Sequence, residues 1–274
     1  MRLAWLCAIA LIVAAGMADA QTAMAPVQPK AEAYLGKARI PDAIAILPPP
    51  PPPGSPQALA DTDAFTQTRA LQGSERWTLA VRDATQYLPA FECPLGLKFA
   101  DWPAPVKALI ARVARDSSII TNQPKDHFAR PRPFIAANGG SNGPICTEAD
   151  RAELMKSFSY PSGHGTFSWT VGLLLAEMAP DHATDVLARA RAFGESRVVC
   201  GVHTVSDVTE SRTNASILVA VLHSDAAFRA DMDTARSALQ AALAAPHASP
   251  DPGQCRVEAD AEAHTPWANP MVAK

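Results

Sequence analysis

Apolar residues recur along most of the chain at the three- and four-residue spacing of an amphipathic helix. The most regular series follows the turn at 160–165 and consists of Phe167, Val171, Leu174 and Met178. A proline and two glycines in that turn predict that a helix begins there, and Pro180 predicts its end. The unpaired backbone amides at the start of such a helix can bind an anion, and the positive end of the helix dipole favours negative charge there.

Further helices follow from the same spacing. One is expected from a cap at Asp61 or Thr62 to about Leu71, and one is opened by Pro103 and Pro105. Two more helices are indicated by the series Trp77, Val81, Ala84 and Leu88 and by a helical pattern that resumes near Ala149. After the helix that ends at Pro180, one helix is marked by Val186, Ala190 and Phe193. The last is marked by Ile217, Leu218, Val221 and Leu222 and continues to Pro246. Alternating runs are missing, and we interpret the valines at 198–205 as a helix end and loop. The sequence predicts an all-α, single-domain helical bundle.

The N-terminus reads as a secretory signal peptide over residues 1–20. Arg2 precedes an apolar run, and Ala18-Asp19-Ala20 forms a cleavage pattern of small residues. We expect cleavage after Ala20 and a periplasmic protein. No later apolar stretch approaches the ~20 residues of a membrane span, so no membrane contact is expected after the signal is removed.

The mature chain divides into three segments by composition. Residues 21–57 form an N-terminal segment with a polyproline arm at Pro48–Pro53, which is either a free linker or an arm packed on the domain. Ile46 and Leu47 favour packing. Residues 58–246 are the expected helical catalytic domain, and the proline-containing residues 247–274 are the expected irregular tail.

Composition adds three limits. A 48% apolar content over 274 residues is ample for a core, and a net charge of −3 gives no reason to expect a nucleic-acid partner. Cys7 leaves with the signal, and the four cysteines that remain favour two disulfides in an exported chain. Three pairings of Cys93, Cys146, Cys200 and Cys255 stay open.

Three separate stretches concentrate cationic, hydroxyl and histidine side chains: 125–133 (KDHFARPRP), 160–165 (YPSGHG) and 196–207 (SRVVCGVHTVSD). If they converge, they supply three cations and two neutral donors, Lys125, Arg132, Arg197, the Ser162 hydroxyl and the Gly163 amide. Arginine forks, a lysine point charge and helix-start amides together bind the oxygens of a tetrahedral oxyanion. The set predicts a phosphoryl-transfer site.

Two histidines complete the predicted chemistry. Asp207 lies four residues after His203, so in a helical turn its carboxylate holds one ring nitrogen protonated and leaves the other free to attack phosphorus. His164 then protonates the leaving alkoxide and later deprotonates water. Because that donor must carry a proton, we expect activity favoured on the acid side of neutrality.

Each residue alone also has a structural explanation. Lys125 and the arginines suit a solvated charged face, Asp207 suits a helix cap, and His203 suits a core histidine. Their joint occurrence at these spacings favours the catalytic interpretation.

The three blocks, Lys-x6-Arg-Pro, Pro-Ser-Gly-His and Ser-Arg-x5-His-x3-Asp, resemble the signature of the type-2 phosphatidic acid phosphatase superfamily, and the chain resembles its secreted bacterial class A nonspecific acid phosphatases. The resemblance extends to the proline run, to residues 68–71 and to Arg76-Trp77. It implies an all-α acid phosphatase that hydrolyses small phosphomonoesters through a phosphohistidine, without a metal or other cofactor. By motif position, phosphate is bound by Lys125, Arg132, Ser162, Gly163 and Arg197, with His164 the acid, His203 the nucleophile and Asp207 its partner.

Two positions depart from the family pattern. Thr204 stands where a tryptophan often follows the nucleophile, and Ser211 stands where glycine is usual. These departures leave the expected chemistry intact and bear on substrate preference and on the shape of the loop.

Three rival interpretations remain. A vanadium-dependent haloperoxidase holds vanadate with similar residues but is usually larger, and a membrane lipid phosphatase needs several spans. An exported anion-binding protein would keep the cations and has no need of both His164 and His203. The sequence does not decide between a monomer and a homo-oligomer.

Overall fold

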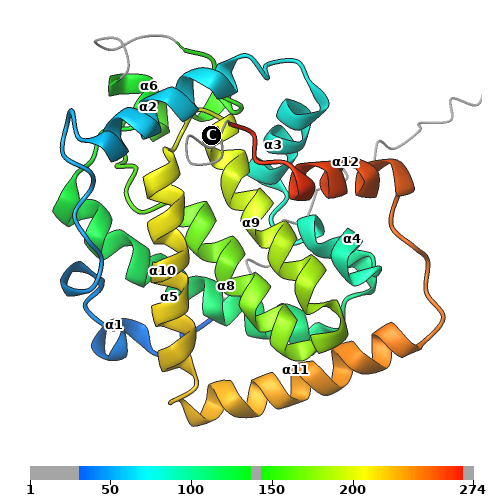
Figure 1. The fold of residues 1–274 in the computed structure, drawn as a ribbon. Coiled ribbons are helices and arrows are strands. Elements are labelled where there is room, and N and C mark those ends of the chain that lie inside the picture. The colour runs from blue at the N-terminus through cyan, green and yellow to red at the C-terminus, as the bar shows by residue number, and fades with distance from the viewer. Residues whose placement is uncertain (1–30, 137–142, 268–274) are drawn as a thin grey trace, which may run out of the picture. The chain divides into compact units, whose positions relative to one another are not determined.

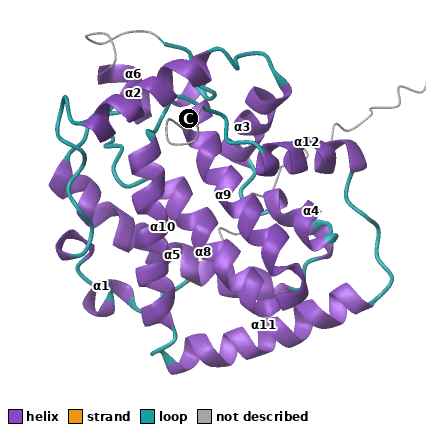
Figure 2. Cartoon of the chain, viewed as in Figure 1, coloured by secondary structure: helices purple, strands orange, loops and turns teal. Residues whose placement is uncertain are grey.

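The central helices of the fold are those that carry the second and third sequence blocks. In the computed structural model, which describes residues 31–136 and 143–267, α8 (Gly163–Met178) packs against α9 (Ala183–Val199) and α10 (Val205–Leu222). The long helix α5 (Ala104–Phe128) packs on α8 and α10, and α11 (Ala226–Ala244) runs beneath them (Figure 1). All regular structure in the described ranges is helical, as predicted (Figure 2).

The remaining helices are shorter or lie around this centre. They are α1 (Gly36–Arg39), α2 (Pro56–Arg69), α3 (Glu75–Thr85), α4 (Glu92–Leu95), α6 (Pro133–Ala136), α7 (Arg151–Leu154) and α12 (Pro252–Ala263). Short 3-10 turns occupy Ala43–Ala45, Pro89–Phe91, Phe99–Asp101, Glu148–Asp150 and Pro180–His182. None of the described helices has the length and apolar character needed to cross a membrane.

The apolar spacing correctly predicts the central helices. In α8, Val171, Leu174 and Met178 are completely buried. A close crossing supports the packing of α8 on α9, because a Cβ on Gly172 would lie 2.6 Å from the Cβ of Ala190. Only a residue without a side chain lets the two backbones approach this far.

Two predicted boundaries are wrong. Helix α2 begins at Pro56 with Ser55 as its cap, six residues before the expected Thr62, and Asp61 lies buried inside it. Proline at the first helical position costs nothing, since that amide has no partner within the helix. The segment from Ile217 to Pro246 is two helices, because the chain turns at 223–225 and Asp225 caps α11 through the Phe228 amide.

The polyproline run packs on the domain rather than forming a free linker. The Tyr160 hydroxyl donates to the Pro48 carbonyl, and Pro50–Pro53 form one wall of a groove whose other walls include Phe65 and Phe128. The prolines thus lie beside the segment that leads into the second sequence block.

The C-terminal segment is not irregular as predicted, because residues 252–263 form α12. Asp251 caps this helix through the Gln254 amide, and the Cys93–Cys255 disulfide fastens it to α4. Its Glu258 is buried and pairs with Arg189 of α9 at 3.1 Å. The predicted signal peptide at 1–20 lies outside the described residues.

Candidate active site

The first block lies at the C-terminal end of α5 and in the loop after it. Helix α5 ends with Ala129 in the left-handed region at φ 46°, so the chain turns sharply toward Arg132. The Lys125 ammonium donates to the Phe158 carbonyl at 2.7 Å, and Arg132 donates to the Leu154 carbonyl at 3.1 Å. Both cations are therefore held against the segment that precedes the second block.

The second block forms the N-terminus of α8. Ser162 caps the helix by accepting from the Gly165 amide at 3.2 Å, which leaves Gly163 and His164 in the first turn. Gly163 lies beside Lys125, since a Cβ built on it would be 3.9 Å from the lysine Cε. The first turn of α8 and the end of α5 thus face a common space.

The third block spans the end of α9 and the start of α10. Thr204 and Asp207 form a reciprocal capping box in which the Asp207 carboxylate accepts from the Thr204 amide at 2.9 Å. The same oxygen, Oδ2, lies 3.3 Å from Nδ1 of His203. The helix-cap explanation and the catalytic interpretation of Asp207 are therefore both compatible with its geometry.

Direct contacts join the three blocks. Nη1 of Arg132 lies 3.3 Å from Nε2 of His203 and donates to the Val202 carbonyl at 2.9 Å. The Ser162 amide donates to the Asp207 carbonyl at 3.0 Å. The structure thus brings together stretches that are up to about 80 residues apart in sequence.

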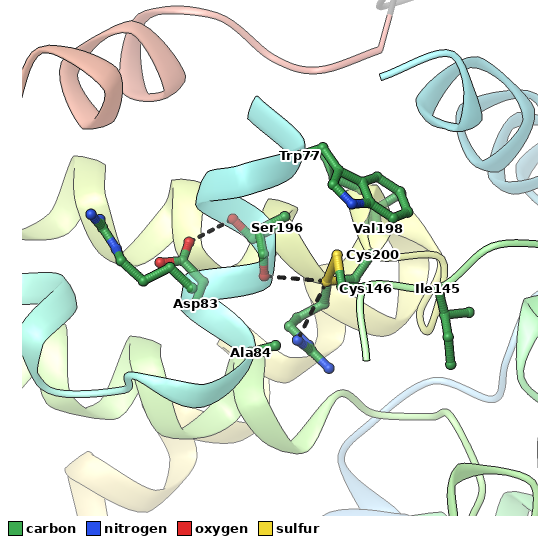
Figure 3. Close-up of a disulfide and its surroundings, with 12 residues drawn as sticks. Trp77, Asp83, Ala84, Ile145, Cys146, Ser196, Val198 and Cys200 are labelled. Carbon is green, nitrogen blue, oxygen red and sulfur yellow. Dashed lines mark hydrogen bonds between the residues drawn. A yellow bond between two sulfur atoms is a disulfide. The ribbon is translucent and has the colours of Figure 1, made fainter. Parts of the chain in front are cut away.

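Arg197 projects from the last turn of α9, near the Cys146–Cys200 disulfide. The disulfide ties this helix end to the loop at Ile145, and Ser196 donates to Asp83 at 2.6 Å, so the end of α9 is fixed against α3 (Figure 3). Arg197 is 2% exposed, and its Nε has no hydrogen-bond partner among the described residues. A buried guanidinium in that state is costly unless an anion binds it.

Burial and mutual repulsion dominate the electrostatics of the site. Burial, followed by repulsion from Arg132, lowers the pKa of Lys125 to about 7. Burial also lowers the pKa of Arg132 and that of Arg197 to about 10 each, with Arg197 contributing to the shift at Arg132. These charges are not a solvated face, because they crowd a pocket that favours an anionic ligand.

Both histidines share this environment. The pKa of His203 is well below its ordinary value because of burial and then the charges of Arg132, Lys125 and Arg197. Burial and then Arg197 likewise lower the pKa of His164, with smaller effects from His203 and Arg132. These shifts favour the neutral form of both rings, which suits the nucleophilic role predicted for His203, whereas the acid role predicted for His164 needs a proton.

A cavity of 520 Å³ opens on the His164 side of the site. It is lined by Lys125, Gly163 and His164 and by the apolar side chains of Ile110 and Phe167. Tyr87 also lines it, with its hydroxyl 2.7 Å from Nε2 of His164 and the two rings stacked 4.7 Å apart. The cavity gives room for the alcohol portion of a substrate next to the residue that we predict protonates it.

Within the described ranges, the His, Cys, Asp and Glu side chains form no group of three or more that could hold a metal ion.

Comparisons with known proteins place the chain among known families. Residues 107–230, which contain all three blocks, match the family model of the PAP2 superfamily. Over 225 residues the chain is 41% identical to an acid phosphatase of Zymomonas mobilis, covering 80% of this chain and 83% of that protein.

Two further relatives carry the name non-specific acid phosphatase. The protein of Providencia stuartii is 35% identical over 211 residues, which are 74% of this chain and 83% of the relative. That of Salmonella typhimurium is 32% identical over 199 residues, which are 70% and 78%. The chain therefore belongs to the PAP2 superfamily, in which its relatives are acid phosphatases.

Sequence reasoning missed Tyr87 and Arg130, which contact predicted catalytic residues, and Asp61, which contacts Arg130. Tyr87 bonds to His164, and Arg130 bonds to both Asp61 and Asp207. Arg130 lies inside the first block, so its position carried a signal, whereas Asp61 was interpreted only as a helix cap. No local pattern marks Tyr87.

Proposed function

We propose that this protein is an acid phosphatase that hydrolyses small phosphomonoesters to an alcohol and inorganic phosphate through a phosphohistidine on His203. The observation that carries the proposal is the arrangement of His203 between Asp207 at 3.3 Å on Nδ1 and Arg132 at 3.3 Å on Nε2. One ring nitrogen is oriented by a carboxylate and the other faces a cation that binds phosphate. Acid phosphatases 32–41% identical to the chain support the enzyme class.

In this proposal the phosphoryl group lies among Lys125, Arg132 and Arg197, with the Ser162 hydroxyl and the Gly163 amide as neutral donors. Arg132 and Arg197 are 5% and 2% exposed, so their charges act in a medium of low polarity. The unpartnered Nε of Arg197 supports its role as a phosphate ligand. Placed cations are the main requirement of phosphoryl transfer, because negative charge spreads over the equatorial oxygens in the transition state.

In the first step, Nδ1 of His203 keeps its proton and donates it in a hydrogen bond to Asp207, while the lone pair of Nε2 attacks phosphorus. The bond between phosphorus and the ester oxygen breaks, and His164 donates its proton to that oxygen. Such acid assistance typically contributes ~10²- to 10⁴-fold. Asp207 stabilises the positive charge that develops on the imidazole.

In the second step, His164 removes a proton from water, whose oxygen attacks phosphorus. The bond between phosphorus and Nε2 breaks, the electron pair returns to the ring, and inorganic phosphate leaves. His164 must be protonated before the first step, although burial lowers its pKa in the free site. The substrate dianion offsets the surrounding cations and so favours that proton, which supports activity on the acid side of neutrality. No step uses a metal.

We extend the proposal to location. The apolar run and Ala18-Asp19-Ala20 support export to the periplasm with cleavage after Ala20, and the Cys93–Cys255 and Cys146–Cys200 disulfides suit an oxidising compartment.

The test is hydrolysis of an aryl phosphate in the presence of a chelator, comparing the intact protein with His203→Ala. We expect turnover with chelator present, inhibition by vanadate, and loss of nearly all activity in the variant. A His203→Ala protein that keeps full activity, or an intact protein that needs added metal, would contradict the proposal.

A further inference from the structure

Arg130 bridges two buried carboxylates, one on each side. Its Nη1 lies 2.7 Å from Oδ1 of Asp207, and its Nη2 lies 3.0 Å from Oδ2 of Asp61. The two aspartate side chains are 0% and 4% exposed, and that of Arg130 is 16% exposed. Charge-assisted hydrogen bonds of this kind fix both the position and the plane of a carboxylate.

The two oxygens of Asp207 have separate partners. Oδ1 accepts from Arg130, while Oδ2 accepts from the Thr204 amide at 2.9 Å and faces Nδ1 of His203 at 3.3 Å. The carboxylate therefore cannot turn away from His203 without breaking the bond to Arg130. Burial alone would lower the pKa of Arg130, but Asp207 and Asp61 raise it above the ordinary value, so the arginine stays charged.

Asp61 completes the arrangement from a distant part of the chain. One of its oxygens accepts from the Ser206 amide at 2.9 Å, and the other accepts from the Ser206 hydroxyl and from Arg130. It thereby fastens α2 to the first turn of α10. Asp61 lies outside residues 107–230, the part that matches the family model.

We propose that Arg130 and Asp61 are positioning residues for the nucleophile: Arg130 holds the Asp207 carboxylate in the plane that orients His203, and Asp61 holds Arg130 in place and balances its charge. The inference rests on the proposed function, because it assumes that His203 attacks phosphorus. Neither residue is among the proposed phosphate ligands, so their removal should lower kcat while leaving KM largely unchanged.

The opposite charges of Arg130 and Asp61 predict shifts of opposite direction in the pH profile when each is removed. Removing a cation beside His203 and its partner Asp207 makes the His203 ring take up a proton at higher pH, whereas removing the Asp61 anion has the opposite effect. The other groups that face this pair, from α5, the following loop, α8, α9 and the segment before α8, are Lys125, Arg132, His164, Arg197 and Tyr160. They are the same in every variant, so the difference between variants isolates Arg130 and Asp61.

The experiment measures kcat/KM against pH for Arg130→Met, Arg130→Lys and Asp61→Asn. For Arg130→Met we expect kcat to fall about tenfold or more, as for the loss of a hydrogen bond to a charged group, and the acid limb to move up by about one pH unit. Arg130→Lys should recover part of both losses, and Asp61→Asn should move the acid limb down. The matched control is Arg112→Met, which breaks a remote pair with Asp231 and should leave the profile unchanged.

The proposal would be overturned if the acid limb stayed in place in Arg130→Met and in Asp61→Asn, or moved in the same direction in these two variants. It would also be overturned if kcat and the acid limb of Arg130→Lys were no closer to those of the intact protein than the values of Arg130→Met. If Arg130→Met does not fold by circular dichroism, the direction of the shift in Asp61→Asn decides. Should the intact protein hydrolyse no phosphomonoester, the proposed function fails; titration of the His203 ring by NMR in the same variants then still tests the positioning claim.

Discussion

The side chain with the most consequential charge in the free site is Lys125. Its pKa of about 7 means that the lysine loses its proton near neutrality, several units below an ordinary lysine. The cause is burial, reinforced by Arg132, and the lysine carries its full charge only on the acid side of this value. An anion that binds beside it favours the protonated form, so binding and proton uptake are coupled.

This coupling predicts how anion affinity depends on pH. Sulfate is a suitable probe, because its charge does not change over this range. Above about pH 7, Lys125 of the free protein is mostly neutral, so sulfate binding must be accompanied by the uptake of one proton from solvent by Lys125. The affinity for sulfate should therefore fall by up to about tenfold for each unit that the pH rises. The contribution of Lys125 to this dependence should level off below pH 7, where Lys125 is already protonated. Calorimetric titration with sulfate from pH 6 to pH 9 measures this dependence.

The variants Lys125→Met and Lys156→Met provide the comparison. Lys156 is exposed and pairs with Glu153 at the surface, so its removal should preserve the dependence on pH. Lys125→Met should bind sulfate more weakly at pH 6 and lose the step near pH 7. A step that persists unchanged in Lys125→Met would assign the proton to another group.

At the scale of helices, the site depends on how closely α8 and α10 approach. A Cβ on Gly165 would lie 2.2 Å from Oγ and 3.0 Å from Cβ of Ser211, so no larger residue fits without moving a helix. Ser162 and His164 lie at the start of α8, and Asp207 lies in the first turn of α10. The spacing between His164 and His203, the proposed acid and nucleophile, therefore depends on one glycine.

Gly165→Ala should accordingly destabilise the fold by about 1–3 kcal/mol through overpacking, and kcat should fall because His164 shifts relative to His203. Ser211→Gly removes both clashing atoms, and glycine is the residue that resembling phosphatases usually have there. In the double variant, part of the stability and of kcat should return. Chemical denaturation and steady-state kinetics on the intact protein, the two single variants and the double variant complete a double-mutant cycle. If the two substitutions changed the free energy of unfolding additively, a direct contact between the two residues would be contradicted.

The helices themselves were largely predictable from sequence, because burial of one apolar face imposes its period on residues such as Val171, Leu174 and Met178. The errors have physical causes. Asp61 is a good cap residue by type, but Ser55 with Pro56 starts the helix earlier and Asp61 serves a tertiary ion pair instead. Helix α12 has no strong apolar periodicity, and the Cys93–Cys255 disulfide and the buried Glu258 hold it in place.

The candidate site likewise has features that the sequence predicts and features that it does not. The three blocks could be predicted to meet, because the joint occurrence of their cations, neutral donors and histidines favours binding of one anion. The roles of Tyr87 and Asp61 could not, since each depends on a contact about 80 to 145 residues away in sequence. The disulfide pairing was equally open until the ends of α9 and α12 were placed.

For the whole molecule, the helices around α8, α9 and α10 serve to fix three distant segments around one point. Lys125 lies in the last turn of α5, α8 begins beside it, and the end of α9 and the start of α10 carry Arg197 and His203. Figure 1 shows these four helices at the centre of the fold. The Cys146–Cys200 disulfide and the bond from Ser196 to Asp83 restrain the element that carries Arg197 (Figure 3). Such a site is assembled before substrate arrives, which reduces the ordering that binding would otherwise require.

The most direct test of this account is to trap the covalent intermediate. Turnover of an aryl phosphate is quenched in alkali, which preserves a phosphohistidine, and the digested protein is analysed by mass spectrometry. We predict phosphate on the peptide that contains His203, sensitive to acid and missing from His203→Ala. Phosphate on another residue, or steady turnover without any phosphate on the protein, would contradict the central claim that the imidazole of His203 bonds to phosphorus.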